Sequence, residues 1–170
     1  MLRRGGSRFV ALDSSPRSML VVSQVTVVAS HWLGAERRSQ RCGGRGCPVC
    51  ASGQEPIDRA YVWVQLGDGS NRILELRARQ EEQLAAQGVT LEQVEGCELV
   101  VKRNGQAFNS PVEVEVVGRA PGRGLPGPEP GLLGLQPPAP ELPGTKNSKV
   151  ARVHPNDPLA GSTPDQPKRK

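Results

Sequence analysis

The chain has 170 residues, with 22 basic and 17 acidic side chains and a formal net charge of +5. This length allows one folded domain and a tail, and the apolar stretch at residues 19–29 is too short and too polar to span a bilayer. The sequence has no glycine-rich phosphate loop, nucleophile elbow or paired-histidine helix. We therefore expect neither a membrane protein nor an enzyme with a small-molecule substrate, but a cytoplasmic protein whose thiols stay reduced.

The charge is distributed unevenly along the chain. Residues 1–50 contain eight arginines but only two acidic residues, Asp13 and Glu36, whereas residues 51–120 contain seven basic and eleven acidic side chains. The positive charge around residues 31–50 favours a polyanionic partner. A loop whose arginines only keep the protein soluble is the alternative.

The chain is expected to begin with a flexible arm, residues 1–17, and Met19 is an alternative start of translation. A first strand follows, because Val21, Val25 and Val27 are β-branched.

Residues 31–50 carry the clearest chemical signal. His31, Cys42, Cys47 and Cys50 follow the spacing His-x10-Cys-x4-Cys-x2-Cys, which supplies the ligands of one tetrahedral zinc site. Neighbouring glycines allow the backbone to curl round an ion. Because four protein ligands leave no position for a catalytic water, we expect one structural Zn²⁺.

Two alternatives remain open for these residues. If His31 is an ordinary histidine at a strand end, Cys97 or a water completes the tetrahedron, although Cys97 is typical of a buried strand cysteine. The segment Cys47-Pro48-Val49-Cys50 also has the form of a dithiol redox pair. Such a pair usually follows a strand and opens a helix in a βαβ unit, which this sequence does not predict.

The remaining sequence up to residue 118 predicts mainly strands. Residues 59–66 alternate with a period of two, which places Ala60, Val62 and Val64 on one face and Tyr61 and Trp63 on the other. A Gly-Asp-Gly turn then predicts a hairpin partner at residues 72–77, followed by a helix at residues 78–87. Residues 97–103 and 112–117 predict two further strands.

Five strands with a helix between the third and fourth have the order of an OB-fold. We therefore expect a mostly β domain over residues 18–118, a small OB-like barrel of about five strands with one helix, in which the zinc-binding loop 31–50 is inserted after the first strand. A looser β-sheet with a zinc-ribbon insert is the competing fold.

Residues 119–170 contain twelve of the sixteen prolines. Such a segment buries too little apolar surface to offset its ordering entropy, and we expect a disordered, Pro/Gly-rich basic tail. Its one apolar cluster, residues 131–135, is either a chance group of leucines or a docking peptide for a protein partner.

Single-stranded nucleic acid binds to cationic grooves in which bases stack on aromatic rings. If Val62 and Val64 fill the core, Tyr61 and Trp63 lie on the outer face, unless they pack under the helix or the metal loop. The candidate nucleic-acid-binding residues are Arg37, Arg38, Arg41, Arg45, Arg59, Tyr61, Trp63, Lys102, Arg103 and Phe108.

The order of the ligands, the aromatic strand and the basic segment at Lys102-Arg103 resembles that of the zinc-containing, helix-destabilising single-stranded-DNA-binding proteins of bacteriophages. The resemblance covers about residues 19–117. It implies an OB-fold, a zinc subdomain with one histidine and three cysteines, and a role in coating single strands during replication and recombination. The spacing between the first two cysteines is shorter here, and the tail is basic where the family often has an acidic terminus.

We therefore expect a non-enzymatic module that binds single-stranded nucleic acid, most simply DNA, in replication or repair. The rival hypothesis is a protein-interaction adaptor, in which the zinc loop and the proline-rich tail recruit partners and the arginines only solubilise the loop.

Overall fold

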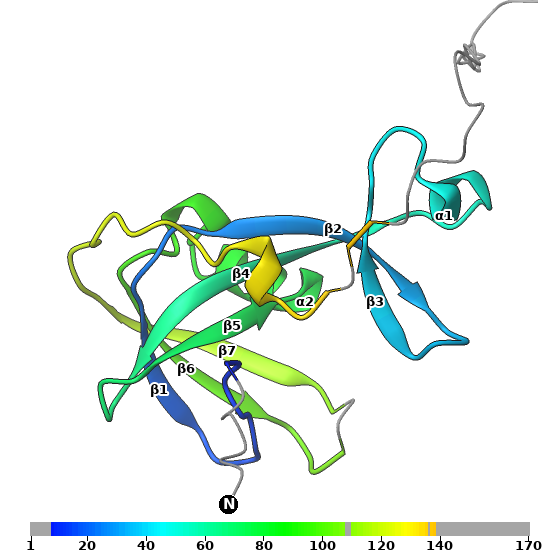
Figure 1. Cartoon of the computed structure of the whole chain (residues 1–170). Helices are drawn as coiled ribbons and strands as arrows, with labels where there is room; N and C mark the ends of the chain where they lie inside the picture. The colour runs from blue at the N-terminus through cyan, green and yellow to red at the C-terminus, as the bar shows by residue number, and fades with distance from the viewer. Residues whose placement is uncertain (1–7, 108–109, 136, 139–170) are drawn as a thin grey trace, which may run out of the picture.

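The computed structural model describes residues 8–107, 110–135 and 137–138, and it consists mainly of antiparallel strands (Figure 1). The strands are β1 (Arg17–Val21), β2 (Thr26–Leu33), β3 (Arg38–Arg41), β4 (Ile57–Leu66), β5 (Asn71–Leu76), β6 (Cys97–Arg103) and β7 (Val112–Arg119). The helices are α1 (Pro48–Ala51) and α2 (Ala78–Ala86), with 3₁₀ turns at Leu91–Gln93 and Pro130–Leu132. No helix in the described ranges is long and apolar enough to cross a membrane.

The long strand β4 organises the sheet. On one edge its first half pairs with β2 and its second half with β1, while β5 pairs with its other edge. Strand β1 continues the sheet through β6 to β7, and β2 pairs with β3 beyond the end of β4. The structure therefore has a body made of β5-β4-β1-β6-β7 and a projecting hairpin, β2–β3.

The sheet does not close into the barrel that we expected. Within the described residues no pairing joins β5 to β7, because helix α2 lies against the outer edge of β7. The Gln80 side chain donates to the Val112 carbonyl (2.8 Å), and the Gln83 side chain accepts from the Val114 amide (3.0 Å). The Gln87 side chain accepts from the Val116 amide (2.7 Å). Three glutamines on one helix face thus hydrogen-bond to the strand edge, where a neighbouring strand would otherwise pair.

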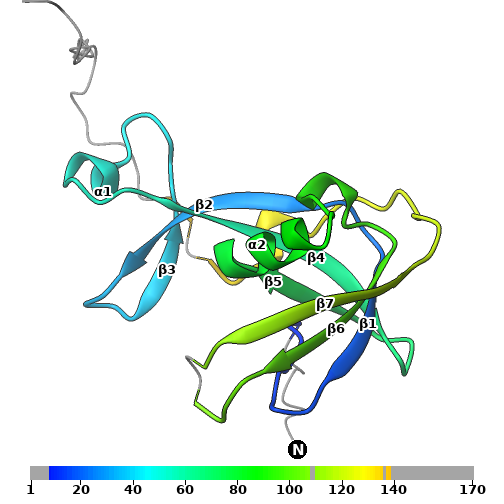
Figure 2. The same cartoon turned by 180° about the vertical axis from the view of Figure 1, so that it is seen from behind.

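The alternation predicted for residues 59–66 is confirmed. Ala60, Val62 and Val64 are fully buried in the main core, between the sheet and helix α2, which covers this face in Figure 2. The predicted helix and the last two strands also lie close to the predicted positions, since α2 spans Ala78–Ala86 and β6 and β7 begin at Cys97 and Val112.

The opposite face of the sheet is covered by both ends of the described chain. Phe9 of the N-terminal arm, whose neighbour Val10 donates to the Ile73 carbonyl (2.9 Å), packs on this face. Residues 120–135, here called the strap, cross the same face, on the side away from α2 (Figures 1 and 2). The strap side chain Leu133 is only 5% exposed and packs in a cluster with Tyr61.

Two expectations about the chain ends are therefore wrong for the described residues. The arm is not loose from Arg8 onward, since Ile73 also donates to the Arg8 carbonyl (2.8 Å). The strap is ordered by apolar contact, and the Gln24 amide donates to the Leu125 carbonyl (2.9 Å). Gly127 lies so close to Thr26 that a Cβ there would clash with its hydroxyl. The leucine cluster docks on its own chain, and the rest of the predicted tail, 139–170, lies outside the described residues.

The glutamine contacts predict a stability effect. Gln83→Ala leaves the Val114 amide without its partner, so we expect a loss of about 1–3 kcal/mol in the free energy of unfolding, measured with urea. Glu82→Ala, at an exposed position on the same helix, is the control and should change stability by less than about 0.5 kcal/mol. Equal effects of the two substitutions would contradict this role of Gln83.

The strap predicts a second effect. Leu133→Ala removes a buried side chain from the sheet face and should cost about 2 kcal/mol or more in urea unfolding. Leu125→Ala, which truncates an exposed leucine of the same segment, should cost under about 1 kcal/mol. If both variants unfold at the same urea concentration as the unsubstituted protein, the strap does not stabilise the sheet.

Candidate metal centre

The four predicted ligands lie on the part of the chain that projects from the sheet. This metal lobe, residues 31–53, comprises the end of β2, strand β3 and helix α1. His31 lies on β2 opposite Gln40 of β3, and Cys42 follows directly after β3, where its amide donates to the Ala29 carbonyl (2.9 Å). The hairpin therefore fixes the positions of His31 and Cys42.

The other two ligands lie on one tight turn. Cys47 is the residue before helix α1, Pro48 is its first residue, and Cys50 lies one turn later. Gly44 and Gly46 adopt φ angles of 72° and 81° in the approach to this turn. Residues with a Cβ rarely adopt such angles, so these glycines let the chain reverse and return Cys47 toward His31.

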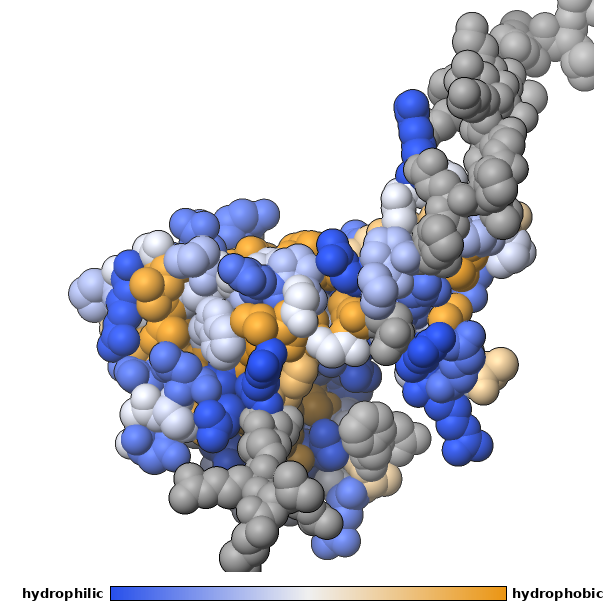
Figure 3. Space-filling model, in the orientation of Figure 1, coloured by the Kyte–Doolittle hydropathy of each residue, from blue (hydrophilic) through white to orange (hydrophobic). Residues whose placement is uncertain are grey.

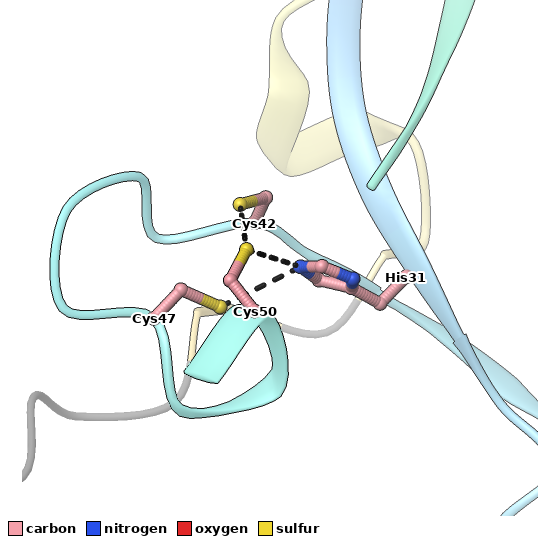
Figure 4. A group of neighbouring side chains, drawn as sticks. All are labelled: His31, Cys42, Cys47 and Cys50. Carbon is pink, nitrogen blue, oxygen red and sulfur yellow. Dashed lines mark hydrogen bonds between the residues drawn. The ribbon is translucent and has the colours of Figure 1, made fainter. Parts of the chain in front are cut away.

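Figure 4 shows the four side chains converging on one point. The Nε2 atom of His31 lies 3.5 Å from Sγ of Cys47 and 3.4 Å from Sγ of Cys50, and the Sγ atoms of Cys42 and Cys50 are 3.5 Å apart. All four candidate ligand atoms lie within 4.8 Å of one another. Tetrahedral coordination at ordinary zinc bond lengths requires about 3.6 Å from nitrogen to sulfur and about 3.8 Å between sulfurs. The cluster therefore has the dimensions of a metal site.

The surroundings of the cluster are consistent with a bound cation. His31 and Cys47 are buried, and the Nδ1 atom of His31 has no hydrogen-bond partner among the described residues. Burial alone would raise the pKa of Cys47, but the backbone N–H groups of Cys50, Gly43 and Val49 outweigh it and lower the pKa to about 6. The neighbouring Cys42 sulfur, together with burial, raises the pKa of Cys50 to about 11. A cation would relieve the repulsion between thiolates gathered this closely.

Cys97 does not belong to this cluster. It is fully buried in the main core on β6, and its thiol lies 3.7 Å from the Gln93 carbonyl, as a structural strand cysteine would. The turn Cys47–Cys50 lies between β3 and β4 in an antiparallel sheet, not in a βαβ unit, and a third cysteine and a histidine adjoin it.

The predicted arginines of residues 31–50 all lie on the lobe. Arg37 occupies the tip of the β2–β3 hairpin, Arg38 and Arg41 bound β3, and Arg45 lies in the glycine-rich loop. Arg38 forms an ion pair with Glu36. This hairpin end is strongly hydrophilic in Figure 3.

Sequence reasoning did not assign Trp32 to the site. Its side chain is 48% exposed, next to the ligand His31. Ser30 pairs with Arg41 and Trp32 with Ser39, so Trp32 and Arg41 project from the same side of the hairpin. The period-two alternation of β2, which sends His31 to one side and Trp32 to the other, was the signal that could have identified it.

The aromatic residues predicted on β4 occupy a different environment from the one expected. Tyr61 is only 2% exposed, and its ring meets that of Phe9 edge-on, with centroids 6.4 Å apart. Trp63 is half-buried against the same cluster. Both rings lie on the outer face of the sheet, as expected, but they are not open to solvent there, because the arm and the strap cover this face.

The remaining candidates lie on the body of the protein. Arg59 on β4 contacts Glu75 on β5 (3.2 Å), and Lys102 on β6 lies 3.7 Å from Glu113 on β7. Arg103 ends β6. Phe108 lies outside the described residues. The structure thus gathers four candidate arginines on the lobe and places the other basic residues on the sheet.

Comparisons of the chain with protein-family models, curated proteins and solved structures gave no match.

The cluster predicts stoichiometric metal binding. Titration with Co²⁺ should give one equivalent per chain, with the sulfur-to-cobalt charge-transfer absorption of a thiolate site. Cys50→Ser should weaken metal binding by more than about tenfold. Cys97→Ser, which removes the thiol outside the cluster, should leave it unchanged. Equal loss in both variants would contradict the assignment of the ligands.

Proposed function

We propose that this protein binds single-stranded nucleic acid without catalysing a reaction, through a lobe held together by one structural Zn²⁺. The observation that carries the proposal is the composition of the β2–β3 hairpin. The strand that supplies the ligand His31 also presents an exposed indole, Trp32, beside a group of arginines.

The identity of the ion follows from the donor set. One imidazole and three thiolates favour zinc over calcium and magnesium, which require oxygen ligands. Because four protein side chains complete a tetrahedron, the ion would have no open position for water or substrate. Its proposed role is to hold the hairpin and the Cys47–Cys50 turn in a fixed relation.

The hairpin offers both contacts that single strands require. Guanidinium groups pair with phosphates irrespective of sequence, and an exposed indole provides a surface on which any base can stack. Arg41 and Trp32 lie on the same side of the hairpin, so one nucleotide could contact both. Recognition of this kind favours single strands, whose bases are free to stack.

The order of pairing in the body supports the part of the proposal that concerns an OB-like fold, which is the fold that the resemblance to the phage-type family implies. Strand β1 pairs with β4 and β6, β4 pairs with β5, and α2 precedes β6 and β7. These pairings match those of a five-stranded Greek-key barrel except for the one that would join β5 to β7, where helix α2 lies instead.

Binding to a fluorescent oligothymidylate tests the proposal. We expect affinity to fall steeply with salt concentration, and Trp32→Ala to weaken binding by about 1–3 kcal/mol, because one stacking surface is lost. Val117→Ala, which truncates an exposed apolar residue on β7, is the control. Both variants should retain the metal content of the unsubstituted protein.

No detectable binding at low salt would refute the proposal and favour the adaptor hypothesis. Tighter binding to duplex than to single strands would also refute it, because a stacked duplex leaves no base face for Trp32.

A further inference from the structure

A cavity lies where the sheet fails to close. It has a volume of about 470 Å³ and is bounded by the N-terminal arm, β5, the start of α2 and the β6–β7 hairpin. Its apolar wall includes Phe9, Leu12 and Val112, and its polar rim includes Arg77, Arg79 and Arg103. A cavity of this size and composition is typical of sites for a small organic group with a charged end.

The charge around this cavity is unbalanced. Glu75 provides the only carboxylate among the described residues that line it. Its Oε1 atom already accepts from Arg77 (3.1 Å) and from Arg59 on β4 (3.2 Å). Arg79 makes no ion pair with any described carboxylate. Arg77 and Arg79 lie close together on the rim and repel each other, and an anion bound there would lower this repulsion.

A row of side chains connects the cavity to the lobe. Arg59 lies opposite Val28 of β2, on the face that carries Trp32 further along the strand. The hydrogen bonds from Arg59 and Arg77 to Glu75 continue the row across β5 to the cavity. Arg59 and Arg77 therefore lie between the hairpin and the opening of the sheet, and both are paired with Glu75.

We propose that this cavity is a second contact site for the strand that binds the lobe, with its arginines receiving phosphate groups and its apolar wall receiving a base. The inference rests on the proposed function. A strand that stacks on Trp32 passes over the strap, which covers this face of the sheet, and ends in the cavity beside Arg77 and Arg79. Short oligonucleotides reach only the lobe, whereas longer ones occupy both sites, so affinity increases with length until the cavity is filled.

Two oligothymidylates, of four and twelve nucleotides, test this inference, since their lengths lie at the short and long ends of the range bound by such modules. Arg79→Glu should weaken binding of the longer strand about tenfold and lower its salt slope by about one, as expected for a lost phosphate contact. The same substitution should leave the shorter strand unaffected. Trp32→Ala should weaken binding of both.

Arg123→Glu is the matched control, because it makes the same change of charge at an exposed position of the strap and gives both variants the same net charge. Both charge variants should keep the thermal midpoint and metal content of the unsubstituted protein. If Arg79→Glu lowers either of them, the milder substitution Arg79→Gln replaces it in the binding experiment. If Arg79→Glu and Arg123→Glu weaken the longer strand equally, the cavity is not a contact site although the lobe still is. If neither strand binds the unsubstituted protein, the proposed function itself fails.

Discussion

The convergence of His31 and three cysteines is the central feature of a lobe that has no apolar core of its own. No residue between 31 and 56 belongs to either hydrophobic cluster in the described residues. The lobe is joined to the body through the ladder between β2 and β4 and through a hydrogen bond from the Gln40 side chain to the Pro137 carbonyl, and its strand β3 and single turn α1 bury little apolar surface. Short elements of this kind fold when a metal ion replaces the missing core. In the proposed zinc-bound protein, the placement of Trp32 and the lobe arginines therefore depends on the ligand cluster.

In the body, both faces of the open sheet and one of its edges are covered by other parts of the chain. Its inner face packs against α2, and its outer face is covered by Phe9 and the strap. The outer edge of β7 is hydrogen-bonded by glutamines of α2. The unpaired backbone groups of an exposed strand edge can pair with a strand of another chain. The glutamine side chains occupy these groups on β7, so no further strand is required there. The same arrangement leaves the opening that the arginine-lined cavity occupies.

The sequence was sufficient for features that follow from local pattern. Alternation along β4 predicted which side chains enter the core, and the spacing of His31, Cys42, Cys47 and Cys50 predicted which residues converge. Features that depend on distant segments were not accessible in this way. The proline and glycine content of the strap is typical of a disordered segment. Composition alone does not show that the strap leucines pack against apolar side chains on the outer face of the sheet. Nothing local in the sequence of α2 shows that Gln83 meets β7 and prevents closure.

Because Tyr61 is buried, the exposed indole of Trp32 is the aromatic surface that can add to the evidence from the lobe arginines. Arginines alone are weak evidence for a polyanionic partner, because a Zn²⁺ bound by three thiolates carries a net negative charge that nearby guanidinium groups would offset. An indole exposed to water has no such electrostatic role, and it forgoes the stabilisation that burial would provide. Trp32 remains half exposed on the strand that also carries His31, while the aromatic residues of the body are covered. The partner that we propose, a single strand of nucleic acid, combines flat bases with negatively charged phosphates and would account for both the indole and the arginines.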